Sequence, residues 1–269
     1  MSSGSRGWLP PPPPPLSSEP GWPEGVGRLI LAETDSTNAE ALRRAEGDLP
    51  LWILARRQTA GRGRRGRVWA SAEGNFAATL AMRPAEDAAT VALRSFVAAL
   101  ALHDALAGLV AETRLALKWP NDVLLDGKKL AGILLESAGA GQGVARLAIG
   151  IGVNLAAAPP RESLPPEALP PVALAEAGPR IAPEDFLDRL APAYAARERV
   201  FATLGFEPIR TAWLSRAARL GGIVTARTGR ETLTGRFETL DASGALVLKT
   251  ADGRRAIPAA EIFFEEARA

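Results

Sequence analysis

The sequence predicts an α+β protein in two parts, a larger unit of mixed strands and helices and a small antiparallel β-barrel after it. In the larger unit, short apolar segments typical of strands alternate with segments whose apolar residues recur at helical spacing. From Gly221 onward, short strand-like segments are separated by turns rich in Gly or Asp, as in a small barrel. At 269 residues, the chain is long enough for both parts.

The first half of the larger unit is expected to contain three strands and two helices. The polar run Asp35–Asn38 supplies several candidate N-caps for the first helix, which Gly47 is expected to end. Pro84 is expected to end the third strand. The elements are, in order, a strand in RLILAE from Arg28, a helix through AEALRRAEG, strands in LWILA (51–55) and NFAATLAMRP, and a helix within 86–110.

The second half begins with three strand-like segments, RLALKWP, DVLLDGKKLAGILLE and VARLAIGIGVNL. The pair Asp126-Gly127 predicts a hairpin turn inside the second of them. Residues 156–183 are rich in Pro and Ala, which predicts a loop or a lid-like connection. Helices over about 184–204 and 207–218 complete the unit.

Residues 1–27 are expected to form a disordered tail rich in Pro, Gly and Ser. The run Pro10–Pro15 favours polyproline II or disorder. The N-terminus lacks the features of a signal peptide, and no apolar stretch has the length of a membrane span. We therefore expect a cytoplasmic protein without a membrane segment, with the main domain at 28–219 and the barrel at 220–269.

The composition excludes several kinds of chemistry. The chain has no cysteine, so disulfides, thiolate catalysis and Cys-ligated metals are ruled out. The single histidine, His103, lies beside the apolar face of a predicted helix, where a satisfied, partly buried side chain is expected. The formal net charge of +2 excludes a generally polycationic binder of DNA or membranes. The remaining candidates are Lys, Arg, Asp, Glu and backbone groups, acting on a nucleotide or with a hydrated metal.

The run GRGRRGR at 61–67 holds four arginines and three glycines. Its glycines match G-x-G-x-x-G, but the residues after Gly66 form turns rather than the helix that a dinucleotide fold requires. A nucleic-acid surface would need more basic residues and exposed aromatics nearby. Glycines allow backbone N–H groups to approach an anion, and guanidinium groups add charge-assisted hydrogen bonds. The run is therefore suited to a clamp on a carboxylate or a phosphate ester. By itself it would indicate a flexible arginine-rich surface loop, and the motifs around it favour the clamp.

The motifs around this run occur together in an order that resembles the biotin protein ligase family. The resemblance spans residues 28 to 265, and the ordered set of motifs is highly specific. The motifs are DSTN at 35–38, QTAGRGRRGR at 58–67 with Trp69 and Ser71, GN at 74–75, KWPND at 118–122, KLAGILLE at 129–136 and GIGVN at 150–154.

This resemblance implies a catalytic domain similar to the class II aminoacyl-tRNA synthetases, followed by an SH3-like barrel. It also implies a reaction in two steps. Biotin and Mg-ATP give biotinyl-5′-adenylate and pyrophosphate, and a lysine of a biotin carboxyl carrier protein then takes the biotin and releases AMP. Biotin, ATP and Mg²⁺ are the implied small molecules, with metal ligands that the sequence does not identify.

The same resemblance implies which residues form the site. The biotin-binding residues would be Ser36, Thr37, Asn38, Gln58, Arg62, Gly63, Arg64 and Lys129. The nucleotide-binding residues would be Arg64, Arg67, Trp69, Lys118, Asn121 and Asn154. The catalytic residues would be Lys129, Arg64, Lys118 and Asp122. Lys129 is preferred to Lys128 because it directly precedes Leu-Ala-Gly.

The residue types suit this chemistry independently of the resemblance. A carboxylate that attacks an α-phosphate brings two anions together, so the site needs positive charge that persists through the transition state. By the resemblance, Asp122 would face the incoming lysine and would orient or deprotonate it, since the unperturbed pKa of a lysine is about 10.4. The alternative for Asp122 is a turn residue at the start of a strand. Trp119 is expected either to wall the biotin tail or to belong to the core.

Two other functions remain open from the residues. A lipoate or octanoate ligase or acyltransferase would share the fold, although the Arg-Gly loop and KWPND argue for biotin. A biotin sensor or nucleic-acid-binding protein would need a reader domain, and the residues before the core are too few and too rich in proline for one. We therefore expect no nucleic-acid partner, and the sequence leaves a homodimer open.

Overall fold

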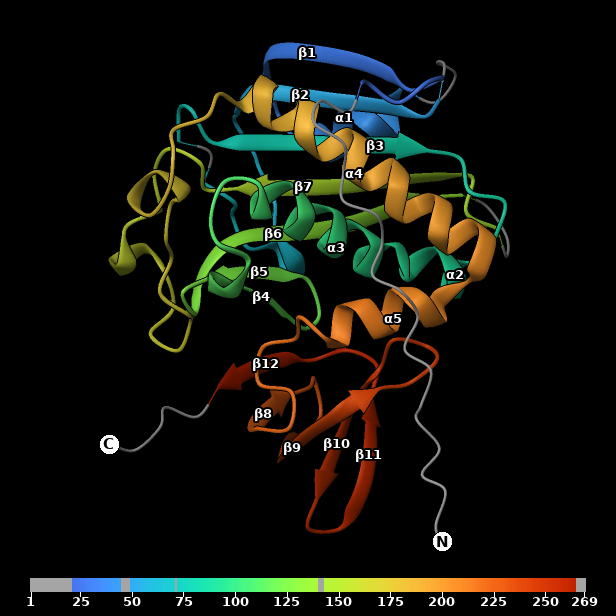
Figure 1. Cartoon of the computed structure of the whole chain (residues 1–269), viewed down its shortest axis with the longest axis vertical. Helices are drawn as coiled ribbons and strands as arrows, with labels where there is room; N and C mark the ends of the chain where they lie inside the picture. The colour runs from blue at the N-terminus through green and yellow to red at the C-terminus, as the bar shows by residue number, and fades with distance from the viewer. Residues whose placement is uncertain (1–20, 45–48, 71, 140–142, 265–269) are drawn as a thin grey trace, which may run out of the picture.

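The computed structural model describes residues 21–44, 49–70, 72–139 and 143–264. These residues form a seven-stranded mixed sheet with helices and, below it in Figure 1, a five-stranded antiparallel sheet. The predicted α+β fold class is confirmed. Ser71, the expected end of the first helix at Gly47 and most of the predicted tail lie outside the described residues.

The seven-stranded sheet contains the strands β1 (Gly27–Thr34), β2 (Leu51–Gln58), β3 (Phe76–Met82), β4 (Leu115–Lys118), β5 (Asp122–Leu125), β6 (Lys128–Ala138) and β7 (Arg146–Val153). The helices are α1 (Thr37–Arg43), α2 (Ala88–Ala92), α3 (Arg94–Ala107), α4 (Pro183–Leu204) and α5 (Phe206–Leu214). The second sheet contains β8 (Ile223–Arg227), β9 (Thr232–Leu240), β10 (Leu246–Thr250), β11 (Gly253–Ile257) and β12 (Glu261–Phe264).

The order in the large sheet is β1-β2-β3-β7-β6-β5-β4, and only the β1–β2 pair is parallel. The predicted hairpin at Asp126-Gly127 is confirmed, since it joins β5 to β6 and both residues have positive φ, 50° and 76°. The helical segment expected within 86–110 is divided at Leu93 into α2 and α3. The helix expected to reach residue 218 ends at Leu214 instead.

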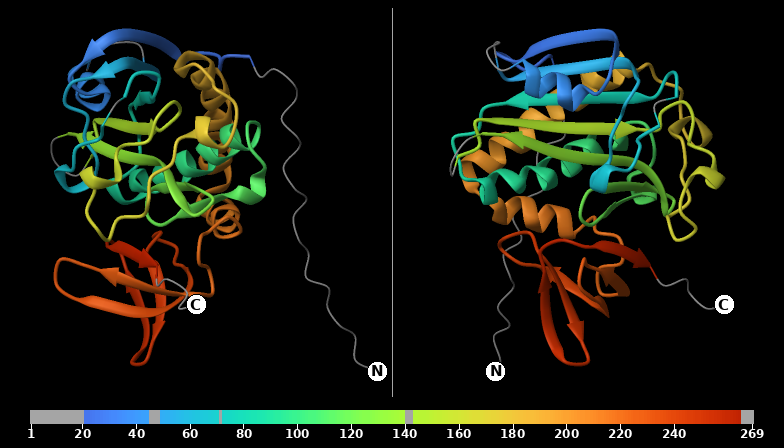
Figure 2. Two further views of the ribbon diagram at one scale, coloured as in Figure 1. Left: turned by 90° about the vertical axis from the view of Figure 1, so that its left-hand side faces the viewer. Right: turned by 180° about the vertical axis from the view of Figure 1, so that it is seen from behind.

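The helices cover the two faces of the large sheet unequally, as the views in Figure 2 show. Helices α3 and α4 lie over one face, where they bury most of the apolar core. The opposite face carries α1, which packs on a small apolar cluster that includes Ala41, Ile53 and Ala148. The rest of that face is left open around the ends of β6 and β7, and the candidate site lies there.

The segment Ala88–Ala107 is long and apolar enough to cross a membrane by composition, but 72% of its apolar window is buried inside the protein. It therefore has the character of a core helix. His103 on α3 is 1% exposed, and its Nδ1 has no hydrogen-bond partner among the described residues, so the expectation of a satisfied histidine was wrong on that point. Burial lowers the pKa of His103 to about 4, so the ring is neutral at pH 7.

Trp119 connects the two sheets. Its side chain is 3% exposed, and its Nε1 donates a hydrogen bond of 3.0 Å to the carbonyl oxygen of Gly244 in the C-terminal sheet. Leu117 on β4 also forms a parallel bridge with Ala217 in the segment that leads to β8. Of the two roles expected for Trp119, the structure supports the core role.

Candidate functional site

A large cavity of about 1230 Å³ opens between the uncovered face of the large sheet, the loop at 61–67, the connection at 159–171 and the C-terminal sheet. Every residue predicted for the site lines this cavity, although these residues come from six separate segments of the chain. The structure therefore brings the whole predicted set together. The roles assigned to the individual residues stay predictions.

Positive charge predominates along the described wall of the cavity. The cationic side chains are Arg62, Arg64, Arg65, Arg67, Lys118, Lys129, Arg161, Arg219 and Arg227. The carboxylates are Asp122, Glu167 and Glu261. A concave surface with this imbalance favours anionic ligands, and low-dielectric walls strengthen the effect.

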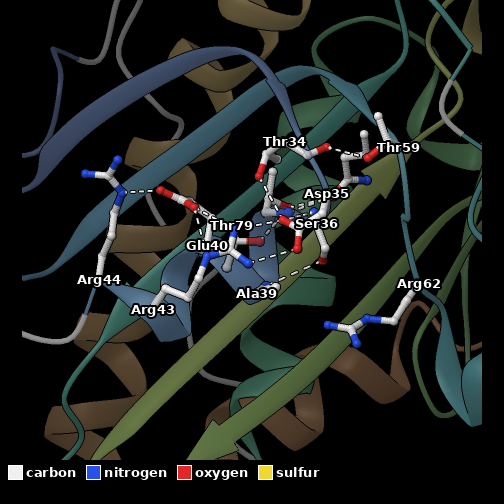
Figure 3. Close-up of polar contacts among 12 residues, drawn as sticks. Thr34, Asp35, Ser36, Ala39, Glu40, Arg43, Arg44, Thr59, Arg62 and Thr79 are labelled. Atoms are coloured by element: carbon white, nitrogen blue, oxygen red, sulfur yellow. Dashed lines mark hydrogen bonds and ion pairs between the residues drawn. The ribbon is translucent and has the colours of Figure 1, made fainter.

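At one end of the cavity, the wall at the start of α1 is formed by uncharged polar side chains (Figure 3). Ser36 is the N-cap of α1, with its hydroxyl oxygen accepting from the backbone N–H of Ala39 at 3.5 Å. Thr37 donates to Oε1 of Gln58 through its backbone N–H at 2.8 Å and its hydroxyl at 3.1 Å. Asp35 fixes this turn from outside, because Arg43 donates to both of its carboxylate oxygens and holds its pKa below the usual range. A neutral, hydrogen-bonding group fits this end better than an ion does.

Asn38 is held by its neighbours inside the protein. Its Nδ2 donates to the carbonyl oxygen of Leu134 at 3.2 Å and to Oε2 of Glu136 at 2.8 Å, which uses both amide hydrogens. Its Oδ1 accepts from the fully buried hydroxyl of Thr79 at 2.7 Å. Asn38 was predicted to bind ligand, but this geometry suits a residue that shapes the pocket from behind. Thr79 and Glu136 are not among the predicted site residues, although Thr79 is a lone hydroxyl in the apolar strand β3 and Glu136 ends the motif KLAGILLE.

Gly150 on β7 makes room for Asn38. A Cβ at this position would lie 2.2 Å from Oδ1 of Asn38, which is far inside contact distance. Gly152, two residues later on the same face of the strand, faces the Trp69 ring in the same way, with a closest approach of 2.4 Å. The floor of the cavity is therefore bare backbone at Gly150 and Gly152. A side chain at either position would displace Asn38 or Trp69.

Gly150→Ala is expected to displace Asn38 and to weaken binding at the uncharged end of the cavity. Overpacking a filled site costs about 1–3 kcal/mol, so we expect stability to fall by that amount and ligand affinity to fall about tenfold or more. Thermal unfolding and calorimetric titration measure the two effects. Gly229→Ala is the matched control, because no atom lies within 4 Å of its Cβ position. Equal affinities in the two variants would show that Asn38 does not shape the pocket.

The centre of the cavity holds a carboxylate between two ammonium groups. Oδ1 of Asp122 lies 2.7 Å from Nζ of Lys129, and Oδ2 lies 3.9 Å from Nζ of Lys118. Burial alone would raise the pKa of Asp122, but the charges of Lys129 and Lys118 outweigh it and lower the pKa. Burial also lowers the pKa of Lys118, and the charge of Asp122 opposes this shift. The cluster thus places a carboxylate and two amine groups close together at the centre of the cavity, two of the three largely buried.

The arginine loop at 61–67 is closed on itself. Arg62 and Val68 form an antiparallel bridge, and a single 3₁₀ turn spans Arg64–Gly66. In the described residues, Gly66 leads into the bridge at Val68 and then to β3, which agrees with the turns expected after this glycine. From this loop Arg62 points over the sheet toward α1 (Figure 3), where its guanidinium lies 3.9 Å from Glu136.

The other loop arginines turn toward two different elements. Nη1 of Arg64 lies 3.4 Å from Oδ1 of Asn121, and its side chain is partly buried, which lowers its pKa. Arg65 and Arg67 instead pair with Glu261 at the start of β12, at 3.1 and 2.6 Å. Glu261 belongs to the C-terminal sheet, and nothing in its sequence neighbourhood indicated that it would reach this loop.

Trp69 and Asn154 border the part of the cavity predicted for the nucleotide. The Trp69 ring lies over β7, with Nζ of Lys129 5.9 Å from its centroid. Asn154 follows β7 and is 3% exposed, and its Nδ2 donates to the carbonyl oxygen of Val172 at 3.2 Å. This bond ties the connection at 159–171 to the sheet, so Asn154 supports the wall that the connection forms.

Comparisons with known proteins agree with this arrangement. The chain matches the model of the biotin/lipoate A/B protein ligase family over residues 26–154 and that of the biotin protein ligase C-terminal domain over residues 220–265. A biotin–[acetyl-CoA-carboxylase] ligase of Paracoccus denitrificans is 58% identical over 239 residues, which cover 87% of this chain and 99% of that protein.

Two solved structures are similar along most of their length. The biotin protein ligase from Aquifex aeolicus in complex with biotin and ATP has a TM-score of 0.71 and 28% identity, covering 88% of this chain and 97% of that chain. The enzyme from Leishmania major in complex with biotinyl-5-AMP has a TM-score of 0.56 and 25% identity, covering 88% and 100%.

Proposed function

The chain belongs to the biotin protein ligase family, and from this premise we propose how its cavity performs the reaction of a biotin–[acetyl-CoA-carboxylase] ligase. The enzyme forms biotinyl-5′-adenylate from biotin and ATP and transfers the biotin to a lysine of the carrier domain. The observation that carries this assignment is one cavity with an uncharged, hydrogen-bonding end and a strongly cationic remainder. Biotin combines a neutral ureido ring with a carboxylate, and ATP supplies the larger negative charge.

The uncharged end receives the ureido ring in this proposal. Ser36, Thr37 and Gln58 hydrogen-bond the ring, while Asn38 holds the turn that carries them. Arg62 and Gly63 close over the ring from the loop. The valeryl chain then extends along the glycine floor of β7 toward Lys129, which binds the carboxylate.

In the first step, a carboxylate oxygen of biotin attacks the α-phosphorus, the bond to the β-phosphate oxygen breaks, and pyrophosphate leaves. Arg64, Lys118 and Lys129 hold the negative charge of the carboxylate and the α-phosphate in place as it redistributes. None of these three has to gain or lose a proton. Arg67 and Asn121 face the phosphates, with Trp69 and Asn154 bordering the nucleoside.

Mg²⁺ is proposed as the ion that accompanies ATP. Among the described residues, no three or more His, Asp or Glu side chains come together. Mg²⁺ usually keeps several waters and binds substrate phosphates with few protein ligands, so this cavity fits an ion that arrives with the nucleotide. It would neutralise phosphate charge there. The proposed location of the enzyme is the cytoplasm.

In the second step, the ε-amine of the carrier lysine attacks the carbonyl carbon of the mixed anhydride, and AMP leaves with the bonding electrons. The amine must lose a proton, and Asp122 is the carboxylate proposed to orient it or to accept that proton. Asp122 is held by Lys129 before the adenylate forms. Once Lys129 turns to the adenylate phosphate, a second ammonium group can approach Asp122.

Asp122→Asn is expected to separate the two half-reactions. Adenylate formation should change less than about threefold, whereas transfer to the carrier should slow by about 10²-fold, at the low end of what a general base supplies. Rapid-quench measurement of pyrophosphate release and of carrier labelling gives both rates. Asp126→Asn is the control, since Asp126 pairs with Arg114 at the exposed hairpin. Equal loss in both half-reactions would mean that Asp122 acts by holding Lys129.

The proposed function itself is tested by incubating the protein with ATP, Mg²⁺ and biotin, with and without an apo carrier domain. Pyrophosphate release that requires biotin, followed by labelling of the carrier, is the expected result. The same assay with lipoate or octanoate tests the alternative substrate class. Pyrophosphate release with lipoate and none with biotin would overturn the assignment.

A further inference from the structure

Glu261 connects the C-terminal sheet to the arginine loop. It is the first residue of β12, and its side chain is 23% exposed. Its Oε1 lies 2.6 Å from Nη1 of Arg67, and its Oε2 accepts from Nη2 of Arg67 at 3.0 Å and from Nη1 of Arg65 at 3.1 Å. One carboxylate therefore holds two arginines of a loop that lies almost two hundred residues away in the sequence.

The other two arginines of the loop, Arg62 and Arg64, make weaker side-chain contacts with the rest of the described protein. Arg62 lies 3.9 Å from Glu136, and Arg64 lies 3.4 Å from Asn121. Like charges act against a closed loop, because Arg64 faces the charges of its neighbours Arg65 and Arg67. Arg65 also occupies the left-handed region at φ 56°, which is unfavourable for a residue with a side chain. A closed loop without ligand thus needs an anion, and Glu261 supplies it.

The geometry leaves the arginines able to bind something else. A guanidinium has five N–H donors in a fixed fork. Glu261 uses two nitrogens of Arg67 and one of Arg65, and both side chains are about half exposed to the cavity or solvent. Glu261 itself lines the same cavity. The carboxylate therefore orients the two guanidinium groups and leaves some of their N–H donors free of Glu261.

We propose that Glu261 is a positioning residue for ATP: it holds Arg65 and Arg67 in a phosphate-ready arrangement before the nucleotide binds. The C-terminal sheet thereby sets the affinity of the catalytic domain for ATP. This inference rests on the proposed function, because it assigns the cationic end of the cavity to the phosphates. The loop at 61–67 is then already ordered by Glu261 in the ligand-free protein, and ligand binding orders it further.

The test compares wild type with Glu261→Gln, which keeps the size of the side chain and removes its charge. Trypsin cuts after arginine, so cleavage within residues 62–67 of the ligand-free protein, followed by mass spectrometry, reports opening of this loop. We expect cleavage there to be about tenfold faster in the variant, as the loss of two partly buried ion pairs implies. We also expect KM for ATP to rise about tenfold and KM for biotin to change less than about twofold.

Glu238→Gln is the matched control. Glu238 lies on β9 of the same sheet and pairs with Arg254 at 2.8 Å, away from the residues that line the cavity. It should leave cleavage and both KM values at wild-type levels. A non-hydrolysable biotinyl-adenylate analogue should protect the loop in all three proteins.

Two results would overturn the inference. Unchanged loop cleavage in Glu261→Gln would show that the carboxylate does not order the loop. A lower KM for ATP would show that Glu261 competes with the phosphates instead of preparing their site. The cleavage assay uses no turnover, and wild-type carrier labelling is measured separately. A failure of the proposed function therefore appears as absent wild-type labelling and cannot be mistaken for either result.

Discussion

Arg64→Gly should turn the enzyme into one that releases biotinyl-5′-adenylate and labels proteins other than its carrier. Arg64 is the most buried arginine of the loop at 61–67, and its guanidinium points at Asn121 beside the Lys118–Asp122–Lys129 cluster. A charge-assisted hydrogen bond contributes about 1.5–3 kcal/mol, so its loss should speed adenylate dissociation by about 10- to 100-fold. The free mixed anhydride then reacts with any accessible amine.

Labelling of a bystander protein such as serum albumin, with the carrier present, measures this release. In Arg64→Gly, the rate of adenylate formation should fall by a much smaller factor than the factor by which adenylate dissociation speeds up. Arg230→Gly is the control, because Arg230 lies in an exposed turn of the C-terminal sheet between β8 and β9. If the albumin were labelled equally by wild type and Arg64→Gly, the loop would have no part in retaining the intermediate.

Lys129→Gln should nearly abolish the first half-reaction. Lys129 is the cation closest to Asp122, and in the proposed mechanism it joins the biotin carboxylate to the α-phosphate. Removing one preorganised donor to developing charge lowers rates by about 10²–10³-fold, and the lost positive charge adds to this effect. We expect single-turnover pyrophosphate release to fall by at least that factor while the fold is retained, because the side chain is 35% exposed and Gln is polar.

Lys128→Gln provides the control within the same sequence. Lys128 is adjacent to Lys129, but it is exposed and does not line the cavity. Residue alternation along β6 places neighbouring side chains on opposite faces of the strand, so only one of the two lysines can face the ligands. Comparable losses in the two variants would mean that charge near the hairpin, and not contact at Lys129, is what the reaction needs.

Much of the fold could be predicted from sequence because strands and helices depend on local patterns. The apolar runs that became β2, β3 and β7 and the turn at Asp126-Gly127 are local signals, and all are present in the structure. The order of the strands could not be predicted in this way. Strand β7 lies between β3 and β6, and nothing in its own residues specifies those neighbours.

The candidate site shows the same division. The arginines of the run at 61–67 and Lys118 and Asp122 of KWPND carry the proposed chemistry in their own side chains, so sequence motifs identify them. Glu261 acts on Arg65 and Arg67, and Glu136 and Thr79 act on Asn38, across long sequence distances. Glu261 and Thr79 are an ordinary Glu and Thr in strands, and their importance depends on the tertiary contact; Glu136 ends the motif KLAGILLE, but its partner Asn38 is likewise known only from the fold. The direction of the Asn38 amide, toward the protein interior, is likewise decided by Thr79 and Glu136.

The glycine floor at Gly150 and Gly152 has a consequence for engineering the enzyme. A designer who wants a bulkier or differently shaped acyl group usually trims or enlarges pocket side chains. Here the floor has no side chain to trim, and enlarging it collides with Asn38 or Trp69. Substitutions meant to change substrate selectivity should therefore be made in the turn before α1 and at Trp69, and Gly150 and Gly152 of β7 should be kept.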